Sequence, residues 1–463
     1  MSAWGDDSTT RDAAMGAGVL LLFAVVIGVA RWEGDRPPRP PNLVVIVIDT
    51  LRADALSSYG HPEATSPELD ALARRGVRFD DVLSNASWTR PSFASMLTSL
   101  SPRASGIRAE RMHVLPEAFV TMPEVLDEAG YVTLGVTANP NINTTFQFDQ
   151  GFDAYVDSGV RWRWMREEAQ EGDLVHGEAP LMPAPEAFER ALSLLETHAS
   201  GEDPVYLQID VMDVHERGDR RVIDERWWSS FEGHPDDTYL SAVRQVSAEI
   251  GAFIEALEAR PELRGDTWYV ITSDHGEGLR SHPHVRRGRD HGFHVYASQV
   301  EVPLIVYRPS RPIEGGRVVE APVQLLDLMP TLLALARAEG PSVMEGRSLV
   351  PLMRGEAVDL PERRVVETWF RGAHAIGVYD DAWAYIEHRR PWDGTNPEEL
   401  QARGRPMDGA RTDRREAHPD VAAELDAHLE AWEEAHPAAR PTRMGHAIPA
   451  HERAQLRALG YIE

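Results

Sequence analysis

The sequence predicts an α/β protein, namely a doubly wound, mostly parallel sheet flanked by helices and followed by a small C-terminal α+β subdomain. The first reason is that runs of apolar and β-branched residues alternate with helical patterns along the chain. The second is that these runs lack the polar alternation of a half-exposed strand, so each strand is expected to be buried on both faces. The third is that the runs end in polar residues, and open α/β sheets hold their ligands at the carboxyl ends of their strands.

The expected strands and helices can be placed by their residue ranges. Buried strands are expected at residues 42–49, 131–137, 205–210, 268–272 and 302–307. Helices are expected at residues 66–75, 121–129, 186–198, 238–259 and 325–336. Past about residue 363 the pattern changes to three short strands and an acidic helix, at residues 365–370, 375–379, 383–388 and 421–435. We therefore expect a main domain over residues 42–362 and a subdomain over residues 363–463.

The N-terminal segment is expected to lie outside the fold. It divides into a tail, a membrane anchor helix and a proline-rich linker, at residues 1–12, 13–30 and 31–41. The anchor segment is apolar throughout and about long enough to span a bilayer, with a cleaved signal peptide as the alternative. Arg31, Arg36 and Arg39 follow it, whereas only Arg11 precedes it. By the positive-inside rule this distribution favours the cytoplasmic side for the domain that follows.

The composition excludes several classes of function. The chain of 463 residues carries a formal net charge of −27, whereas nucleic-acid binding needs a basic face, so no nucleic-acid partner is expected. It contains no cysteine, which excludes disulfides, thiolate nucleophiles and cysteine-ligated metals. It also contains no lysine, so every basic side chain apart from histidine is an arginine.

The stretch SWTRPSFASMLTSLSP is expected to place a hydroxyl at the start of a helix. Pro91 suits the first helical position, and Phe93, Met96 and Leu97 recur at helical spacing. Thr89 would then lie just ahead of the helix, beside unpaired N–H groups and the positive end of the helix dipole. That environment favours a developing anion, so Thr89 is a candidate nucleophile. The alternative for a lone threonine is a helix cap or a loop residue.

Four polar clusters share one edge of the predicted sheet. Asp49, Thr89, the pair Asp213 and His215, and the pair Asp274 and His275 each follow or face a strand end, and four further histidines follow the fourth strand. Two carboxylates, an imidazole and a hydroxyl oxygen suit a divalent cation. Such a cation would stabilise an oxyanion and lower the pKa of the Thr89 hydroxyl.

These motifs resemble those of the sulfatase family of the alkaline phosphatase superfamily, from about Pro41 to the end of the chain. The stretches that carry the resemblance are VVIVIDTLRADALSSYG, LDALARRGVRFDDV, SWTRPSFASMLTSLSP, DVMDVHE, TSDHGEG, HGFHVY before VPLIVY, DLMPTLLALA, GRSLVPLMRG and LRALGYIE. The resemblance implies a metal-dependent α/β hydrolase with a small C-terminal sheet that works outside the cytoplasm. It thus implies an extracytoplasmic catalytic domain on a single-pass anchor, whereas the arginine distribution favours the cytoplasmic side.

The resemblance also implies roles for single residues. Asp49 resembles the first metal ligand of the family, Asp274 and His275 the later metal pair, and Thr89 the nucleophile that also contacts the metal.

His215 resembles the histidine that contacts the transferred group. His282 and His291 resemble histidines that hold substrate oxygens or the leaving group. With a second metal, Asp213, His215 and His291 would be its ligands, and Asp213 otherwise borders the substrate. The metal is expected to be Ca²⁺, Mn²⁺, Zn²⁺ or Mg²⁺.

The sequence departs from the family pattern at the nucleophile. Sulfatases carry a cysteine or serine there, which is oxidised to formylglycine, within a C-x-P-S-R motif. Here the motif reads T-x-P-S-F, so no formylglycine is expected, and Phe93 replaces the arginine. The active-site lysine of the family has no counterpart, which leaves Arg90 as a candidate source of positive charge.

This departure favours phosphoryl chemistry. A formylglycine hydrate releases sulfate by collapsing to the aldehyde, an exit that a threonine sulfate ester lacks. A threonine phosphate ester can instead be attacked in line at phosphorus by water or an alcohol. We therefore expect a phosphoester or phosphodiester hydrolase, or a phospho-group transferase, acting on a small anionic ester. The alternatives are a degenerate sulfatase that only binds an anionic ligand and a true sulfuric ester hydrolase.

Overall fold

The computed structural model describes residues 39–108, 113–157, 182–215, 223–228, 230–263, 265–283, 285, 287–391, 395–404 and 413–439. The predicted tail, the predicted anchor helix and most of the predicted linker lie outside these residues, so the membrane anchor stays a prediction. Among the helices of the described part, none has both the length and the apolar character needed to cross a membrane.

An eight-stranded sheet forms the centre of the fold, in the order β5-β4-β6-β1-β7-β8-β2-β9. Its strands are β1 (Asn42–Ile48), β2 (Val77–Phe79), β4 (Val132–Thr137), β5 (Ala154–Asp157), β6 (Val205–Val211), β7 (Thr267–Thr272), β8 (Leu304–Tyr307) and β9 (Arg317–Val319). β1 lies between β6 and β7 and is parallel to both, with Ile46 opposite Ile209 and Ile271. Only β8 runs antiparallel to its neighbours β7 and β2, which confirms the mostly parallel sheet.

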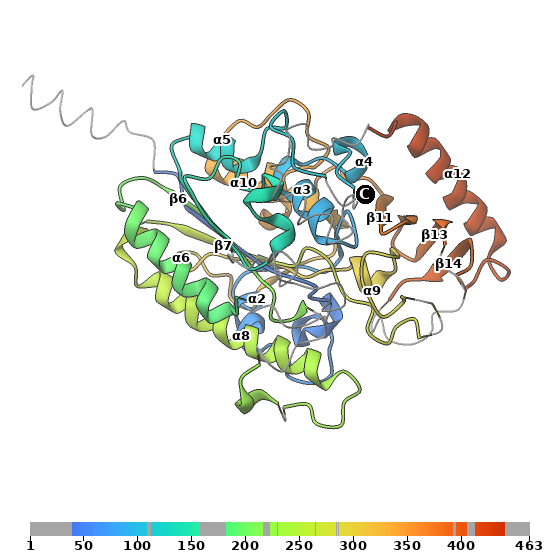
Figure 1. Ribbon diagram of the computed structural model, residues 1–463, viewed down its shortest axis with the longest axis horizontal. Coiled ribbons are helices and arrows are strands. Elements are labelled where there is room, and N and C mark those ends of the chain that lie inside the picture. The colour runs from blue at the N-terminus through green and yellow to red at the C-terminus, as the bar shows by residue number, and fades with distance from the viewer. Residues whose placement is uncertain are drawn as a thin grey trace, which may run out of the picture. The chain divides into compact units, whose positions relative to one another are not determined.

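Helices cover both faces of this sheet, as Figure 1 shows. They are α2 (Pro67–Ala73), α3 (Thr89–Thr98), α5 (Met122–Glu128), α6 (Ala184–His198), α8 (Asp237–Glu258) and α10 (Leu328–Ala336). Alternate side chains of β1 enter different cores: Ile46 packs with residues of α2, α6 and α8, and Val45 packs with residues of α3, α5 and α10. This is the doubly wound arrangement that uninterrupted apolar strands predict, because such strands must bury both faces.

The remaining elements are short. A two-stranded parallel ribbon joins β3 (Val82–Leu83) to β10 (Val323–Gln324). Short helices are α4 (Pro102–Ser105), α9 (Ala297–Val300) and α11 (Val350–Arg354). The 3₁₀ turns are η1 (Ala53–Ala55), η2 (Ser57–Tyr59), η3 (Pro140–Ile142), η4 (Thr144–Phe146), η6 (Glu225–Trp227), η7 (Pro261–Leu263) and η8 (Leu325–Asp327).

A second, antiparallel sheet follows near the C-terminus, with α12 (Pro419–Ala435) packed on one face (Figure 1). Its strands are β11 (Arg364–Phe370), β12 (Ala373–Tyr379), β13 (Trp383–Arg390) and β14 (Glu398–Ala402). Three of them match the predicted short strands. The sequence analysis missed β14, because its residues EELQA include two glutamates and no β-branched or aromatic side chain.

Partly buried ion pairs hold the antiparallel sheet against the parallel one. Asp81, between β2 and β3, pairs with Arg364 at 2.6 Å and with Arg403 at 2.7 Å, and Arg403 also reaches Glu301 at 3.0 Å. Burial raises the pKa of the Asp81 carboxyl, but the two arginines outweigh that effect and lower it to about 2. We call this group of four charged residues the seam network.

Candidate metal centre and active site

Adjacent parallel strands bring two carboxylates to one point of the sheet edge. Asp49 follows β1, and Asp274 follows β7, its neighbour in the sheet. The chain turns sharply after Asp49, where Thr50 has φ of 60°, a left-handed conformation that is unusual for a β-branched residue. The turn is held by the Thr50 N–H, which donates to Asp274 Oδ1 at 3.3 Å, and by the hydroxyl of Tyr239, which donates to the Thr50 carbonyl at 2.9 Å.

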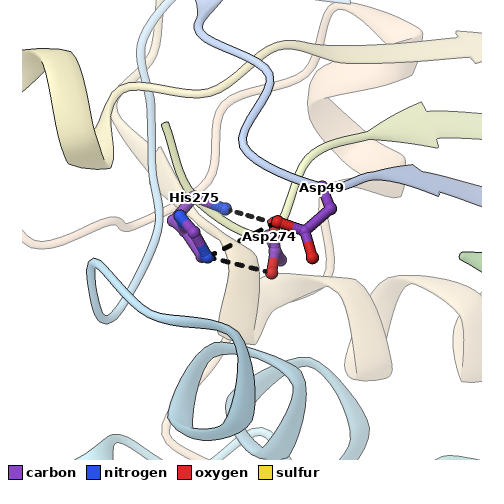
Figure 2. Close-up of side chains that lie close together, drawn as sticks. All are labelled: Asp49, Asp274 and His275. Atoms are coloured by element: carbon purple, nitrogen blue, oxygen red, sulfur yellow. Dashed lines mark hydrogen bonds and ion pairs between the residues drawn. The ribbon is translucent and has the colours of Figure 1, made fainter. Parts of the chain in front are cut away.

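His275 completes a set of three ligand atoms, shown in Figure 2, that lie within 4.8 Å of one another. Its Nδ1 lies 2.9 Å from the Gly276 carbonyl, which makes Nδ1 the protonated nitrogen and leaves the lone pair of Nε2 on the side of the carboxylates. Nε2 is 3.3 Å from Asp274 Oδ2 and 3.8 Å from Asp49 Oδ1. We call Asp49, Asp274 and His275 the metal-ligand group.

The metal-ligand group fits a divalent cation on structural grounds. Asp49 Oδ1 and Asp274 Oδ2 are buried, and no donor among the described residues hydrogen-bonds to either oxygen. Such buried, unsatisfied acceptors are costly unless a cation lies between them. Two carboxylate oxygens and an imidazole nitrogen are ligands that Mn²⁺ and Zn²⁺ accept.

The electrostatics of the group also favour a cation. Burial raises the pKa of Asp49 well above its ordinary value, and the charges of Asp274 and Asp210 raise it further. Burial likewise raises the pKa of Asp274, to about 7, and lowers the pKa of His275 well below its ordinary value. A bound divalent cation would reverse these carboxyl shifts by supplying the positive charge that this buried site lacks.

Thr89 lies beside the metal-ligand group at the beginning of α3. Its side chain is buried, and Oγ1 is 3.3 Å from His275 Nε2. The helix begins at Thr89 itself, so the expectation that Pro91 is the first helical residue was wrong. Pro91 is the third residue of the helix, still in the first turn, where its missing N–H leaves no intrahelical bond unmade. The predicted proximity of Thr89 to the helix N-terminus is confirmed.

Two further histidines adjoin this group. The ring of His291 lies 4.8 Å from that of His275 and 5.1 Å from that of His215, measured between centroids. His291 Nδ1 is 3.0 Å from Glu277 Oε2. Burial lowers the pKa of His291, but the Glu277 carboxylate outweighs that effect and the net pKa is raised. Burial and the charge of His291 lower the pKa of His215 well below its ordinary value.

The remaining predicted site residues, Arg90, Asp213 and His282, each contact other parts of the protein. The Arg90 guanidinium carbon lies 3.6 Å from the centroid of the Phe146 ring, and Nε donates to the Asn141 carbonyl at 3.1 Å. Both carboxylate oxygens of Asp213 accept the N–H of the first residue of α6, at 3.1 and 2.9 Å, so this side chain caps that helix. The ring of His282 stacks on Tyr296 with 3.7 Å between centroids. Their roles toward a substrate stay predictions.

The sequence analysis missed three polar residues of the site. Asn139 donates from Nδ2 to both Asp49 and Thr89. Asp210, the penultimate residue of β6, is fully buried near the two ligand carboxylates, and burial raises its pKa well above its ordinary value. Glu277 orients His291. A signal for Asn139 existed: it follows a predicted strand, as Asp49 and Asp274 do, but the Asn-Pro dipeptide was interpreted only as the end of that strand.

Comparisons with known proteins identify the family to which the chain is similar. The family model described as "Sulfatase" matches residues 41–338, and that described as "N-sulphoglucosamine sulphohydrolase, C-terminal" matches residues 290–431. The chain is 28% identical to arylsulfatase A of Homo sapiens, with 74% of this chain and 72% of that protein covered. It is 24% identical to human N-acetylgalactosamine-6-sulfatase, with 73% of each chain covered.

Solved structures show the same fold. A 2-O GAG sulfatase superposes with a TM-score of 0.66 at 19% identity, over 90% of this chain and 100% of that chain. The phosphonate monoester hydrolase from Silicibacter pomeroyi superposes with a TM-score of 0.62 at 21% identity, over 86% of this chain and 96% of that chain. These likenesses confirm the predicted fold class.

Proposed function

From the fact that this chain belongs to the sulfatase family of ester-hydrolysing enzymes, we propose that it hydrolyses or transfers the phospho group of a small anionic phosphoester, with Thr89 as nucleophile. The observation that carries the proposal is the position of the Thr89 hydroxyl, 3.3 Å from the nitrogen of His275 that faces the two ligand carboxylates. A hydroxyl that is buried at a helix N-terminus, beside such a group, is placed for activation.

In this proposal the metal-ligand group holds one divalent cation. When bound, the cation supplies positive charge to the oxygens of the transferred group and lowers the pKa of the Thr89 hydroxyl. The chain itself aligns the hydroxyl, excludes water from it by burial, and places the N-terminal N–H groups of α3 nearby. His291, whose Nδ1 lies 3.0 Å from Glu277 Oε2, is the proposed proton donor to the leaving group.

The choice of phosphorus over sulfur rests on how the two esters of threonine break down. The Thr89 hydroxyl gives up its proton as Oγ1 attacks phosphorus, the bond to the leaving oxygen breaks, and that oxygen takes up a proton in turn. Water or an alcohol then attacks the phosphothreonine in line and gives up a proton, so that phosphate or a new phosphoester leaves and the threonine oxygen is protonated again. A threonine sulfate has no aldehyde to collapse to, so its sulfate must be displaced directly.

A true sulfatase is the second candidate, because curated relatives matched over about three quarters of this chain carry sulfatase names. The two candidates differ in the atom that is attacked, not in the residues that surround it. The third possibility, a binding protein without turnover, predicts metal binding and no ester cleavage.

Activity of the full-length protein on four aryl esters tests the proposal. We would assay an aryl phosphate, a diaryl phosphate, an aryl phosphonate and an aryl sulfate, with Mn²⁺, Zn²⁺, Ca²⁺ and Mg²⁺ in turn. We expect turnover of a phosphorus ester that falls at least about 1000-fold in Thr89→Ala, while Mn²⁺ binding is kept. Thr98→Ala is the matched control, because Thr98 is a buried threonine at the other end of the same helix that donates to the Ala94 carbonyl.

Each other outcome contradicts the proposal in a distinct way. Turnover of the aryl sulfate alone would establish the sulfatase. Metal binding without turnover of any ester would favour the binding protein. Phosphoester turnover that survives in Thr89→Ala would remove Thr89 as the nucleophile.

A further inference from the structure

The amide of Asn139 lies between the metal-ligand group and the candidate nucleophile. Asn139 follows β4, and its side chain is fully buried. Its Nδ2 donates one hydrogen bond to Asp49 Oδ2 and another, at 3.3 Å, to Thr89 Oγ1. The other oxygen of Asp49, Oδ1, is the one left to face a cation. One amide group therefore contacts a metal ligand and the proposed reacting atom at once.

The orientation of this amide is set by its other end. Asn139 Oδ1 accepts the backbone N–H of Asn141 at 2.8 Å and its side-chain Nδ2 at 3.1 Å. A reversed amide would set its NH₂ group against these two donors and its oxygen against the Asp49 carboxylate. The contacts with the Asn141 N–H and with the Asp49 carboxylate would then be unfavourable, so Nδ2 must face Asp49 and Thr89.

A buried carboxylate fixes the backbone from which Asn139 projects. Asp210 Oδ2 accepts the Asn139 N–H at 3.2 Å and the Thr137 hydroxyl at 3.0 Å. Thr137 lies opposite Asp210 in the pairing of β4 with β6, and the Ala138 N–H donates to the Asp210 carbonyl at 3.1 Å. The turn after β4 is thus attached to the neighbouring strand by three hydrogen bonds.

We propose that Asn139 is a positioning residue, which holds Asp49 Oδ2 and Thr89 Oγ1 so that Asp49 presents Oδ1 to the cation and Thr89 presents its oxygen to the ester. Asp210 holds Asn139 in place. The part that concerns Thr89 rests on the proposed function, whereas the part that concerns Asp49 depends only on metal binding. The alternative is that Asn139 serves only as the cap of η3, through the contact of its Oδ1 with the Asn141 N–H.

Asn143 provides a matched control for that alternative. It caps η4 in the same way, since its Oδ1 accepts the Thr145 N–H at 3.0 Å. Asn143→Ala therefore removes a cap of the same kind, four residues further along the chain. Asn139→Asp is the complementary variant, because it keeps an oxygen for the Asn141 donors and replaces only the NH₂ group that faces Asp49 and Thr89.

The test measures kcat, KM, Mn²⁺ affinity by calorimetry and melting temperature in the full-length protein. In Asn139→Ala we expect kcat to fall about 100-fold, KM to change less than about threefold, and Mn²⁺ to bind about 10-fold more weakly, because second-layer partners of a metal site have effects of this size. In Asn139→Asp we expect the same loss of kcat in the folded protein, with a lower melting temperature because a carboxylate oxygen then faces Asp49. In Asn143→Ala we expect neither kcat nor Mn²⁺ affinity to change.

The proposal is overturned if both Asn139 variants keep the kcat and the Mn²⁺ affinity of Asn143→Ala. If Asn139→Ala does not fold, the loss of kcat in Asn139→Asp decides. If the wild-type protein cleaves no ester, the proposed function fails but the Mn²⁺ titrations still decide this inference: weaker binding in Asn139→Ala supports it, and unchanged binding overturns it.

Discussion

Among the described residues, two groups of buried histidines and carboxylates differ in whether their carboxylate oxygens meet hydrogen-bond donors. In the metal-ligand group, three ligand atoms converge within 4.8 Å, and two carboxylate oxygens accept no hydrogen bond from the described residues. The second group, which we call the histidine cluster, lies between the antiparallel sheet and the loop that follows β7. Its members are His282, His294, Tyr296, His388 and Glu399.

In the histidine cluster the carboxylate oxygens accept hydrogen bonds from partners within the protein. The rings of His282 and His294 stack on Tyr296, with 3.7 and 5.0 Å between centroids. The hydroxyl of Tyr296 donates to Glu399 Oε1 at 3.1 Å, and Gln401 donates to Oε2 at 2.7 Å. Both carboxylate oxygens are therefore occupied. The same residue types make a cation site only where acceptors converge without donors, and elsewhere they make packing.

The largest expected effect comes from exchanging one carboxylate for an amide in each group. Asp274→Asn removes a charged ligand and sets an NH₂ group beside His275. We expect Mn²⁺ binding to be lost and turnover to fall at least about 1000-fold. Glu399→Gln makes the same chemical change in the histidine cluster, where we expect both quantities to stay within about twofold. Calorimetry and the ester assay measure both, and equal losses in the two variants would end the distinction.

The next effect concerns the seam network, which joins the two sheets. Asp81→Asn leaves Arg364, whose side chain is 1% exposed, without the charge of its partner. We expect the free energy of unfolding to fall by about 3 kcal/mol, the size typical for breaking a buried ion pair, with Mn²⁺ affinity unchanged.

The neighbouring residue supplies the control for that change. Asp80→Asn removes a carboxylate that is 38% exposed and pairs with Arg78 at 3.3 Å. We expect a change of less than about 1 kcal/mol, because exposed ion pairs contribute little. Urea denaturation followed by circular dichroism measures both variants. Similar losses of unfolding free energy in the two variants would show that burial does not increase the contribution of the seam network to stability.

A smaller effect is expected from removing one histidine of each group. His275→Ala deletes the only imidazole of the metal-ligand group, and we expect Mn²⁺ to bind about 100-fold more weakly. Removing a residue that only supports a metal ligand weakens binding by about 10- to 100-fold, and loss of the ligand itself is expected to reach the upper end of that range. His388→Gln changes a histidine of the other cluster and is expected to leave Mn²⁺ affinity unchanged. A Mn²⁺ affinity that depended on His388 would place a ligand where the geometry has none.

The smallest effect concerns pH and the histidine cluster. Burial, together with the smaller effect of the charges of His294 and His282, lowers the pKa of His388 to about 3. The unfolded chain, with an ordinary histidine pKa near 6.5, therefore binds a proton that the folded chain does not bind as the pH falls below 6.5. Neutral His388 therefore costs the folded state no stability at pH 7, and the free energy of unfolding falls progressively as the pH is lowered toward 3.

The size of the pH effect follows from that difference in pKa. The shifted pKa of His388 is expected to lower the free energy of unfolding by about 2 kcal/mol between pH 7 and pH 5. His388→Gln should lose correspondingly less stability between pH 7 and pH 5 than the wild type, which urea denaturation at the two pH values measures. An identical loss in both proteins would show that His388 is protonated in the folded state.

Much of the fold follows from the sequence, because burial on both faces requires uninterrupted apolar strands. Residues 42–48 and 205–210 show this pattern and form adjacent central strands. The strand-end rule then predicted that Asp49 and Asp274 lie close together, and the structure brings them together. The rule succeeds because parallel neighbours end at the same edge of a sheet, whatever the length of chain between them. β14 was missed because its side chains do not show the pattern of a strand.

The contacts of single side chains were decided by the tertiary structure. Asn139 reaches Asp49 across 90 residues of sequence. Asp213 caps α6, because the first N–H of that helix lies within 3.1 Å of its carboxylate, and this contact was not predicted from the sequence. The apolar pattern determines which way a strand runs and where it ends. Which donor meets which acceptor there depends on distances between segments far apart in the chain, and local patterns do not encode those distances.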